Sequence, residues 1–143
     1  MGKKYLSISV VVALTLFVMA FPSQAQQKEV VIGAIYPLTG PAAPAGADVK
    51  NGTELAIEII NGVFDFNLPL AKTAGLPRLG GQKVRYIFAD HQGNPEKSLS
   101  EAERLINENK VVALQGTYHS SCAATASQVA ERMGIPFMSD VSS

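Results

Sequence analysis

Short apolar runs alternate with longer amphipathic segments along the chain. The apolar runs are continuous enough for parallel strands that are covered on both faces. They lie at residues 29–36, 83–90, 111–114 and 135–138. The amphipathic segments repeat apolar residues at helical spacing. They lie at residues 47–61, 95–109 and 121–133. The resulting order, βαβαβαβ, predicts an α/β fold with a parallel sheet and right-handed crossovers.

Local sequence signals set several helix boundaries. Asn94 is a good N-cap, and Pro95 suits the first position of the second helix. Gly134 is expected to end the third helix. In the first helix, apolar and small residues gather on one face, which is the face expected to pack on the sheet. These residues are Gly52, Leu55, Ala56, Ile59 and Ile60.

Two connecting segments are rich in turn-forming residues. Residues 37–46 contain three prolines and two glycines, which predicts an ordered loop. This loop follows the first strand, where open α/β sheets place their ligand loops, but it contains neither GxGxxG nor GxxxxGK[ST]. The start of residues 63–82 is consistent with a short strand or hairpin, before glycine and proline interrupt the segment. The alternating residues are Phe64, Phe66, Leu68 and Leu70.

Residues 111–127 contain the best candidate for a binding site. They combine a buried strand, a turn at Gly116, a cluster of hydroxyl residues and a helix rich in small residues. Ser120 or Ser121 is expected to cap that helix. Backbone N–H groups, hydroxyls and the positive end of the helix dipole would then point to one spot, which predicts a receptor for a carboxylate or phosphate. The alternative is that the serines only cap the helix.

Other reactive side chains have simpler explanations than catalysis. Asp90 and His91 are suited to acid–base chemistry, but an aspartate in a loop after a strand usually bonds nearby backbone N–H groups. His119 beside Ser120 lacks a GxSxG elbow, and sequence neighbours rarely form a Ser–His pair. Cys122 lies among alanines at a helix start and is expected to be a small buried thiol. No catalytic residue is therefore predicted.

Composition excludes several classes of protein. Basic and acidic residues number 12 each, and no basic patch with interleaved aromatics indicates a nucleic-acid partner. The single cysteine permits no internal disulfide. The CxxC and HExxH spacings of zinc sites are absent, so neither a metal site nor another cofactor is expected.

Residues 1–25 have the features of a cleavable signal peptide. Two lysines form a positive n-region, and residues 6–21 form an apolar h-region. Ser23 and Ala25 are small residues at the positions that a signal peptidase recognises, which predicts cleavage after Ala25. An uncleaved membrane anchor is the alternative, but the apolar run is short for a span of about 20 residues. The sequence therefore predicts export to the periplasm.

Four segments together resemble one protein family. They are IGAIYPLTGP at residues 32–41, ADHQGNP at 89–95, SLSEAERLI at 98–106 and ASQVAERMGIP at 126–136. The family is the periplasmic substrate-binding proteins of branched-chain amino-acid-type ABC transporters, which have the type I periplasmic-binding fold. Its members have two α/β lobes that close on a ligand in the cleft between them. The resemblance implies that residues 26–143 are the first part of the N-terminal lobe and that the second lobe is absent from this sequence.

The resemblance also implies which residues bind the ligand. Ser120 would bind an α-carboxylate, with Ser121 and the backbone around His119 close by. The loop after the fourth strand would bind the α-ammonium through a backbone carbonyl and a hydroxyl, here Val141 and Ser143. Neutral hydroxyls and backbone groups suit a carboxylate in a desolvated cleft because they add no buried counter-charge.

The predicted function is therefore binding. An exported solute-binding protein would capture an amino acid, by default of the branched-chain type, or a similar small amphoteric ligand, and deliver it to a membrane ABC permease. The alternative is a ligand-sensing receptor or regulator module of the same fold. A hydrolase that uses Ser120 is a third class.

Overall fold

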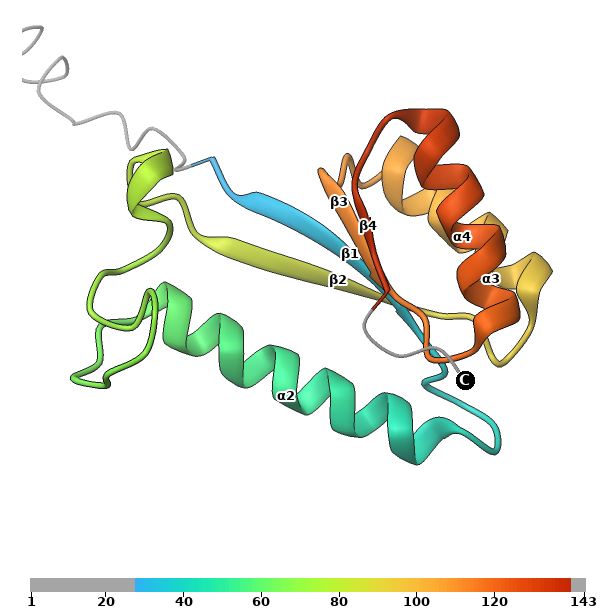
Figure 1. Cartoon of the computed structure of the whole chain (residues 1–143), viewed down its shortest axis with the longest axis horizontal. Coiled ribbons are helices and arrows are strands. Elements are labelled where there is room, and N and C mark those ends of the chain that lie inside the picture. Colours follow the sequence, from blue (N-terminus) through green and yellow to red (C-terminus); the bar gives the residue numbers. More distant parts are fainter. Residues whose placement is uncertain (1–27, 140–143) are drawn as a thin grey trace, which may run out of the picture.

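The computed structural model describes residues 28–139, which form a four-stranded parallel sheet with helices on both faces (Figure 1). The strands are β1 (Val30–Tyr36), β2 (Val84–Asp90), β3 (Ala113–Gly116) and β4 (Phe137–Met138). The helices are α2 (Ala43–Asn61), α3 (Pro95–Asn107) and α4 (Ser120–Met133), with a 3₁₀ turn at Pro77–Leu79. The strand order is β2-β1-β3-β4, and all neighbours are parallel. The predicted α/β fold and the βαβαβαβ order are thus confirmed.

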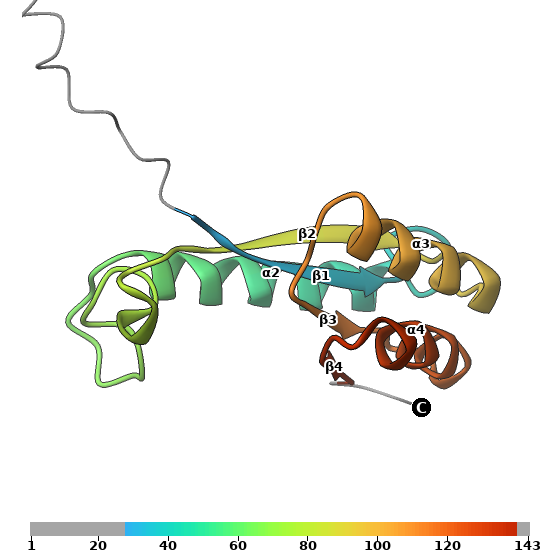
Figure 2. The ribbon, with the colours of Figure 1, turned by 90° about the horizontal axis from the view of Figure 1, so that it is seen from above.

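The helices cover the two faces of the sheet unequally. α3 and α4 pack against each other on one face, and α2 runs along β2 on the other (Figures 1 and 2). Side chains of β1 alternate between the faces. Val31 and Ile35 pack toward α3 and α4, whereas Val30 and Ile32 face α2. The sheet is therefore the middle of three layers.

The main core lies between the sheet and the α3–α4 pair. Ile35, Leu105, Leu114 and Val129 are buried there and come from four different elements. Gly33 permits this packing, because a Cβ at this position would lie 2.7 Å from Cδ2 of Leu114. The close contact lets the helices bury apolar side chains directly against β1, which is the main source of stability in such a fold.

Helix α2 begins earlier than the sequence pattern predicts. It starts at Ala43 rather than at residue 47. The predicted loop at residues 37–46 is therefore correct for residues 37–42, and residues 43–46 belong to the helix. Pro44 lies in the first turn. A proline is compatible with this position because the first N–H groups of a helix need no intrahelical partner.

The face of α2 that packs on the sheet matches the prediction only in part, since Gly52, Ala56 and Ile60 line the space next to the sheet as expected. Leu55, expected against the sheet, is 59% exposed. Gly46 explains the difference, since a Cβ there would lie 2.1 Å from the carbonyl oxygen of Pro37. Gly46 therefore has to face the end of β1, and helical periodicity then sets the rest of the inner face. The residues turned toward the sheet include Val49, Thr53, Ile57 and Ile60.

Strand β3 begins later than its apolar run. Lys110 has a φ of 55°, and N–H of Val111 donates to the carbonyl of Leu105, which closes the end of α3. Val111 is consequently buried in the core, whereas Val112 is 54% exposed. The predicted strand at residues 111–114 is therefore wrong at its start, because Val111 closes the end of α3, and N–H of Val112 donates to the carbonyl of Val31 in β1 just before β3 begins.

The alternation at the start of residues 63–82 predicted a short strand or hairpin, and the structure shows neither there. Later in this segment, an isolated antiparallel bridge joins Leu76 to Gln82 across the 3₁₀ turn. The rings of Phe64 and Phe66 stack with centroids 5.4 Å apart, so the alternation reflects local packing in a loop. The side chain of Asn61 donates to the carbonyl of Val84 at 2.7 Å and accepts from its N–H at 2.8 Å. This pair of bonds joins the end of α2 to the start of β2 across the long loop.

The cap predictions for α3 and for the end of α4 are confirmed. Asn94 accepts from two backbone N–H groups of the first turn of α3, and Pro95 is its first residue. Gly134 ends α4 in the left-handed conformation. Among the helices of residues 28–139, none has the length and apolarity needed to cross a bilayer. The predicted targeting segment, residues 1–25, lies outside the described residues.

Candidate functional site

Asp90 connects the loops at the carboxyl edge of the sheet. Its Oδ1 accepts from the N–H groups of Leu38 and Gln92, both at 2.9 Å, and its Oδ2 accepts from the Thr39 hydroxyl at 2.6 Å. Burial raises the pKa of Asp90, but the hydrogen bonds, led by that of Thr39, outweigh it and leave the pKa below its usual value. Asp90 therefore bonds nearby backbone, as predicted, and also ties the β1 loop to β2.

His91 joins the β2 loop to the turn after β3. It is fully buried. Its Nε2 lies 2.7 Å from the carbonyl oxygen of Thr117, and its Nδ1 accepts from N–H of Gly93 at 2.8 Å. A carbonyl only accepts, so Nε2 carries the proton and the ring is neutral. Burial is the main reason that the pKa of His91 is lowered. Because both ring nitrogens are hydrogen-bonded to loop backbone, the geometry favours a role for His91 in positioning these loops over acid–base catalysis with Asp90.

The chain leaves β3 through a tightly packed turn. Gly116 has a φ of 150°, and a Cβ there would lie 2.3 Å from the carbonyl oxygen of Ile35, so only glycine fits. Thr117 is buried, and its hydroxyl donates to the carbonyl of His119 at 2.9 Å. Tyr118 has a φ of 80°, in the left-handed region. This turn places the amino end of α4 at the carboxyl edge of the sheet.

The N-cap of α4 is His119, so the prediction that Ser120 or Ser121 caps this helix is wrong. The backbone of His119 is extended, and its side chain makes no capping hydrogen bond. Ser120 and Ser121 already lie within the first turn, and both are exposed. A capping side chain must precede the helix to reach its N–H groups. Capping therefore does not explain either serine.

A cavity of about 240 Å³ opens beside the amino end of α4. The β1 loop, the β2 loop and His119 line it. Because the dipole of α4 favours negative charge at this end, the surroundings suit an anionic group. Of the predicted site residues, His119 lines the cavity, and Ser120 and Ser121 directly follow it in the chain. Val141 and Ser143 lie outside the described residues.

His91, His119 and Cys122 come together beneath this edge, although α3 and β3 separate the first from the others. Sγ of Cys122 lies 3.7 Å from Nδ1 of His91, and the two imidazole rings meet edge to face with centroids 5.3 Å apart. Cys122 is fully buried, as predicted, and burial raises the pKa of its thiol. Sequence reasoning missed the cluster because no motif spacing links His91, in the loop after β2, to His119 and Cys122 at the start of α4.

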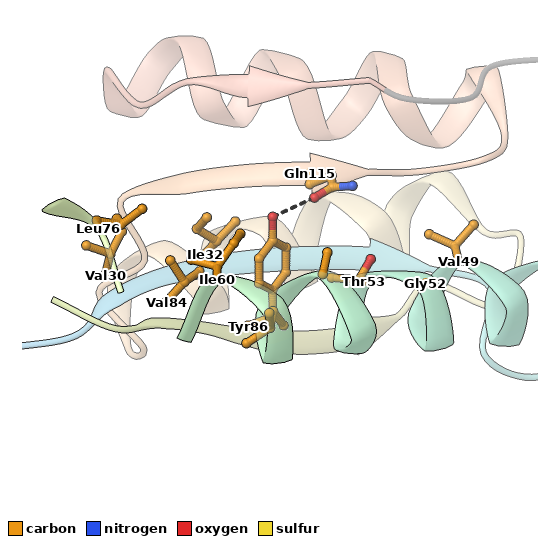
Figure 3. Close-up of a pocket in the computed structure, with 12 residues that line it drawn as sticks. Val30, Ile32, Val49, Gly52, Thr53, Ile60, Leu76, Val84, Tyr86 and Gln115 are labelled. Atoms are coloured by element: carbon orange, nitrogen blue, oxygen red, sulfur yellow. Dashed lines mark hydrogen bonds between the residues drawn. The ribbon is translucent and has the colours of Figure 1, made fainter. Parts of the chain in front are cut away.

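A larger cavity, of about 540 Å³, lies between α2 and the sheet (Figure 3). Its lining is mostly apolar and includes Val30, Ile32 and Ile60. The hydroxyl of Tyr86 donates to Oε1 of Gln115 at 2.8 Å, which links β2 to β3 over β1. Sequence reasoning missed this cavity because its shape depends on the rotation of α2. None of the predicted site residues lines it.

Comparison with known proteins identifies the class of protein. A family model described as "Periplasmic binding protein" matches residues 29–143. The chain therefore belongs to the periplasmic binding protein family. This family consists of substrate-binding proteins rather than enzymes, in agreement with the sequence prediction.

Named relatives confirm the predicted resemblance to branched-chain amino-acid-type substrate-binding proteins. The chain is 34% identical over 118 residues to Leu/Ile/Val-binding protein homolog 7 of Brucella suis, covering 82% of this chain and 25% of the relative. The chain thus spans about a quarter of the length of this curated relative.

Solved structures share the fold. The branched-chain amino acid transporter substrate-binding protein LivJ from Streptococcus pneumoniae, in complex with isoleucine, has a TM-score of 0.65 and 22% identity, covering 81% of this chain and 30% of its own. A solute-binding protein from Rhodopseudomonas palustris, in complex with benzoate, has a TM-score of 0.64 and 24% identity, covering 80% and 28%. The α/β fold of this chain is therefore shared with solved substrate-binding and solute-binding proteins.

Proposed function

We propose that this chain is the first part of the N-terminal lobe of an exported solute-binding protein that captures a branched-chain amino acid and delivers it to an ABC permease. The family and its Leu/Ile/Val-binding relatives support this function. The observation that carries it is the amino end of α4, where the exposed Ser120 and Ser121 directly follow His119, which lines a cavity formed with the β1 and β2 loops.

The amino end of α4 suits the carboxylate of the ligand. Backbone N–H groups of the first helical turn and the hydroxyls of Ser120 and Ser121 are donors, and the helix dipole favours negative charge. The backbone around His119 completes this end of the site. Because none of these donors carries a formal charge, a carboxylate binds without burying a cationic side chain, whose desolvation would oppose closure of the cleft.

The ammonium group of an amino acid needs acceptors instead of donors. We assign these to the carbonyl of Val141 and the hydroxyl of Ser143, which follow β4. β4 pairs with β3 in parallel register, so the segments that leave the two strands start at the same edge of the sheet. A second lobe would close over both groups by a hinge motion. Uptake that depends on the permease distinguishes this role from that of a ligand-sensing receptor.

Export rests on the signal peptide proposed for residues 1–25. Secretion and amino-terminal sequencing of the mature protein check it. A mature chain that begins at Gln26 would support export to the periplasm, whereas a chain that keeps residues 1–25 would contradict cleavage.

An aromatic acid is the second candidate ligand, because one structural neighbour was solved in complex with benzoate. Such a ligand has a carboxylate for the amino end of α4 but no ammonium group. It would therefore bind independently of the Ser143 hydroxyl, which gives a simple distinction between the two ligand classes.

Calorimetric titration of the full-length protein tests the proposal. Leucine, isoleucine, valine and benzoate are titrated into the wild type and into Ser120→Ala and Ser143→Ala variants. We expect an amino acid to bind and Ser120→Ala to weaken it about tenfold, the loss of one hydrogen bond to a charged group. Ser127→Ala is the matched control, since Ser127 lies further along α4 and its hydroxyl bonds the carbonyl of Ala124. Unchanged affinity in Ser120→Ala would contradict the carboxylate site.

A further inference from the structure

The fold gathers the chain's two histidines and its single cysteine at one place. His91 comes from the loop after β2, His119 is the N-cap of α4, and Cys122 lies in the first turn of α4. One potential ligand atom of each lies within 4.8 Å of the others. Imidazole nitrogen and thiolate sulfur are ligands that Zn²⁺ and related ions prefer.

The spacing of these atoms fits coordination of one ion. Sγ of Cys122 and Nδ1 of His91 are 3.7 Å apart. Around a tetrahedral ion with bonds of about 2.3 Å to sulfur and about 2.1 Å to nitrogen, two such ligand atoms lie about 3.6 Å apart. The separation of these two atoms is therefore the one that a shared ion requires.

His91 already has the hydrogen bond that orients a metal ligand. Histidines that bind metal through one nitrogen usually donate the other N–H to a carboxylate or a backbone carbonyl. Nε2 of His91 makes this bond with the carbonyl of Thr117, which leaves the lone pair at Nδ1. That lone pair accepts from N–H of Gly93, so an ion would have to displace this hydrogen bond. Gly93 is exposed and lines the cavity, where water can replace Nδ1 as the acceptor of its N–H.

His119 supplies an unsatisfied nitrogen. Its Nδ1 is buried and has no hydrogen-bond partner among residues 28–139. Such orphaned polar atoms are uncommon in folded proteins because they lose their bonds to water and gain none in return. The ring is only partly buried and lines the cavity of about 240 Å³, and one of its nitrogens lies within 4.8 Å of the ligand atoms of His91 and Cys122.

We propose that His91, His119 and Cys122 form a Zn²⁺ site, with two Nδ1 atoms and one thiolate as ligands and a fourth position open to the cavity. Neutral imidazoles and one thiolate leave a bound Zn²⁺ with a net charge of one. Binding releases the thiol proton of Cys122 to solvent through the cavity, because a coordinating thiol is deprotonated. The ion would link the β2 loop to α4. This site stands on the fold alone and does not depend on the proposed amino-acid ligand.

Cobalt titration of the metal-free full-length protein tests the site, because a cobalt–thiolate bond gives a charge-transfer band in the near ultraviolet. We expect a band that saturates at one Co²⁺ per protein and disappears when Zn²⁺ is added. The Cys122→Ala variant should show no such band. Zn²⁺ should raise the Tm of the wild type but leave the Tm of Cys122→Ala unchanged.

Two further variants keep the test decisive if Cys122→Ala folds poorly in circular dichroism. His119→Gln should retain the fold and weaken Co²⁺ binding about tenfold or more. Ser127→Ala, on the same helix, should bind Co²⁺ like the wild type. Absence of the thiolate band in the wild type would overturn the proposal, as would equal Co²⁺ affinity in His119→Gln.

Discussion

Gly46 lies directly against Pro37, so closely that a Cβ at position 46 would be 2.1 Å from the Pro37 carbonyl oxygen. This contact sets the rotation of α2 over the sheet. The same contact packs α2 against Pro37, the first residue of the β1 loop, and Pro37 also lines the cavity beside α4. A single glycine thereby connects the packing of a helix to the shape of the candidate site.

Replacement of Gly46 by alanine should destabilise the folded protein, whereas the same replacement at Gly52, also in α2, should stabilise it. We expect Gly46→Ala to lower the free energy of unfolding of the full-length protein by about 1–3 kcal/mol, because the new methyl group clashes with backbone. Gly52 is the matched control, because a Cβ there would meet nothing within 4 Å. Gly52→Ala should raise the free energy of unfolding by about 0.5–1 kcal/mol, through the higher helix propensity of alanine. Urea denaturation measures both, and equal effects would refute the role of the Pro37 contact.

Removal of the Asp90 carboxylate should release the β1 loop. Asp90→Ala leaves N–H of Leu38 and the Thr39 hydroxyl without their acceptor, so we expect the free energy of unfolding to fall by about 1.5–3 kcal/mol. Asp48→Ala is the control, because Asp48 is exposed on α2 and its removal should change stability by less than about 0.5 kcal/mol.

The Asp90 effect should depend on pH. The pKa of Asp90 is lowered in the folded protein, so its stabilisation is present above the unfolded value of 3.8 and is lost as pH falls through the folded pKa. The stability difference between wild type and Asp90→Ala should therefore shrink in strong acid. A difference that stays constant down to the lowest pH at which the protein folds would contradict a charged Asp90.

Buried His91 should make the protein less stable in mild acid. Its folded pKa is lowered below 6.5 chiefly by burial, which outweighs the opposing hydrogen bond to the Thr117 carbonyl, and the charge of His119 acts in the same direction as burial. The unfolded chain consequently binds more protons below pH 6.5, and stability falls with pH until the folded pKa is reached. His91→Asn should be less stable than wild type at pH 7, but its stability should change less between pH 6.5 and the folded pKa. Denaturation at a series of pH values measures this slope, and an equal slope in the variant would rule out His91 as its source.

Much of the fold was predictable because its signals are local. The apolar runs predict the four strands, and Asn94, Pro95 and Gly134 mark helix ends through bonds to their own neighbours. The edge that carries the candidate site was predictable too, since parallel strands end on the same side of a sheet. The position of the hydroxyl cluster after the third strand followed from the same rule.

Features that depend on contacts between distant segments were not predictable. The periodicity of α2 identified part of its inner face, but the Gly46–Pro37 contact turned the helix so that Leu55 is exposed. The N-cap moved from the serines to His119 because the turn after β3 determines where α4 begins. Hydrophobic patterns report which residues are apolar, and only packing decides which of them are covered.

The sequence by itself determined the class of fold, the order of its elements, the family resemblance and the loops in which a ligand site would lie. These properties follow from periodicity, helix caps and motifs, each of which acts over a few residues. Tertiary structure alone decided that Asp90 holds the β1 loop and that His91, His119 and Cys122 meet. Those contacts join segments separated by whole helices and strands, and their geometry exists only once the sheet has assembled.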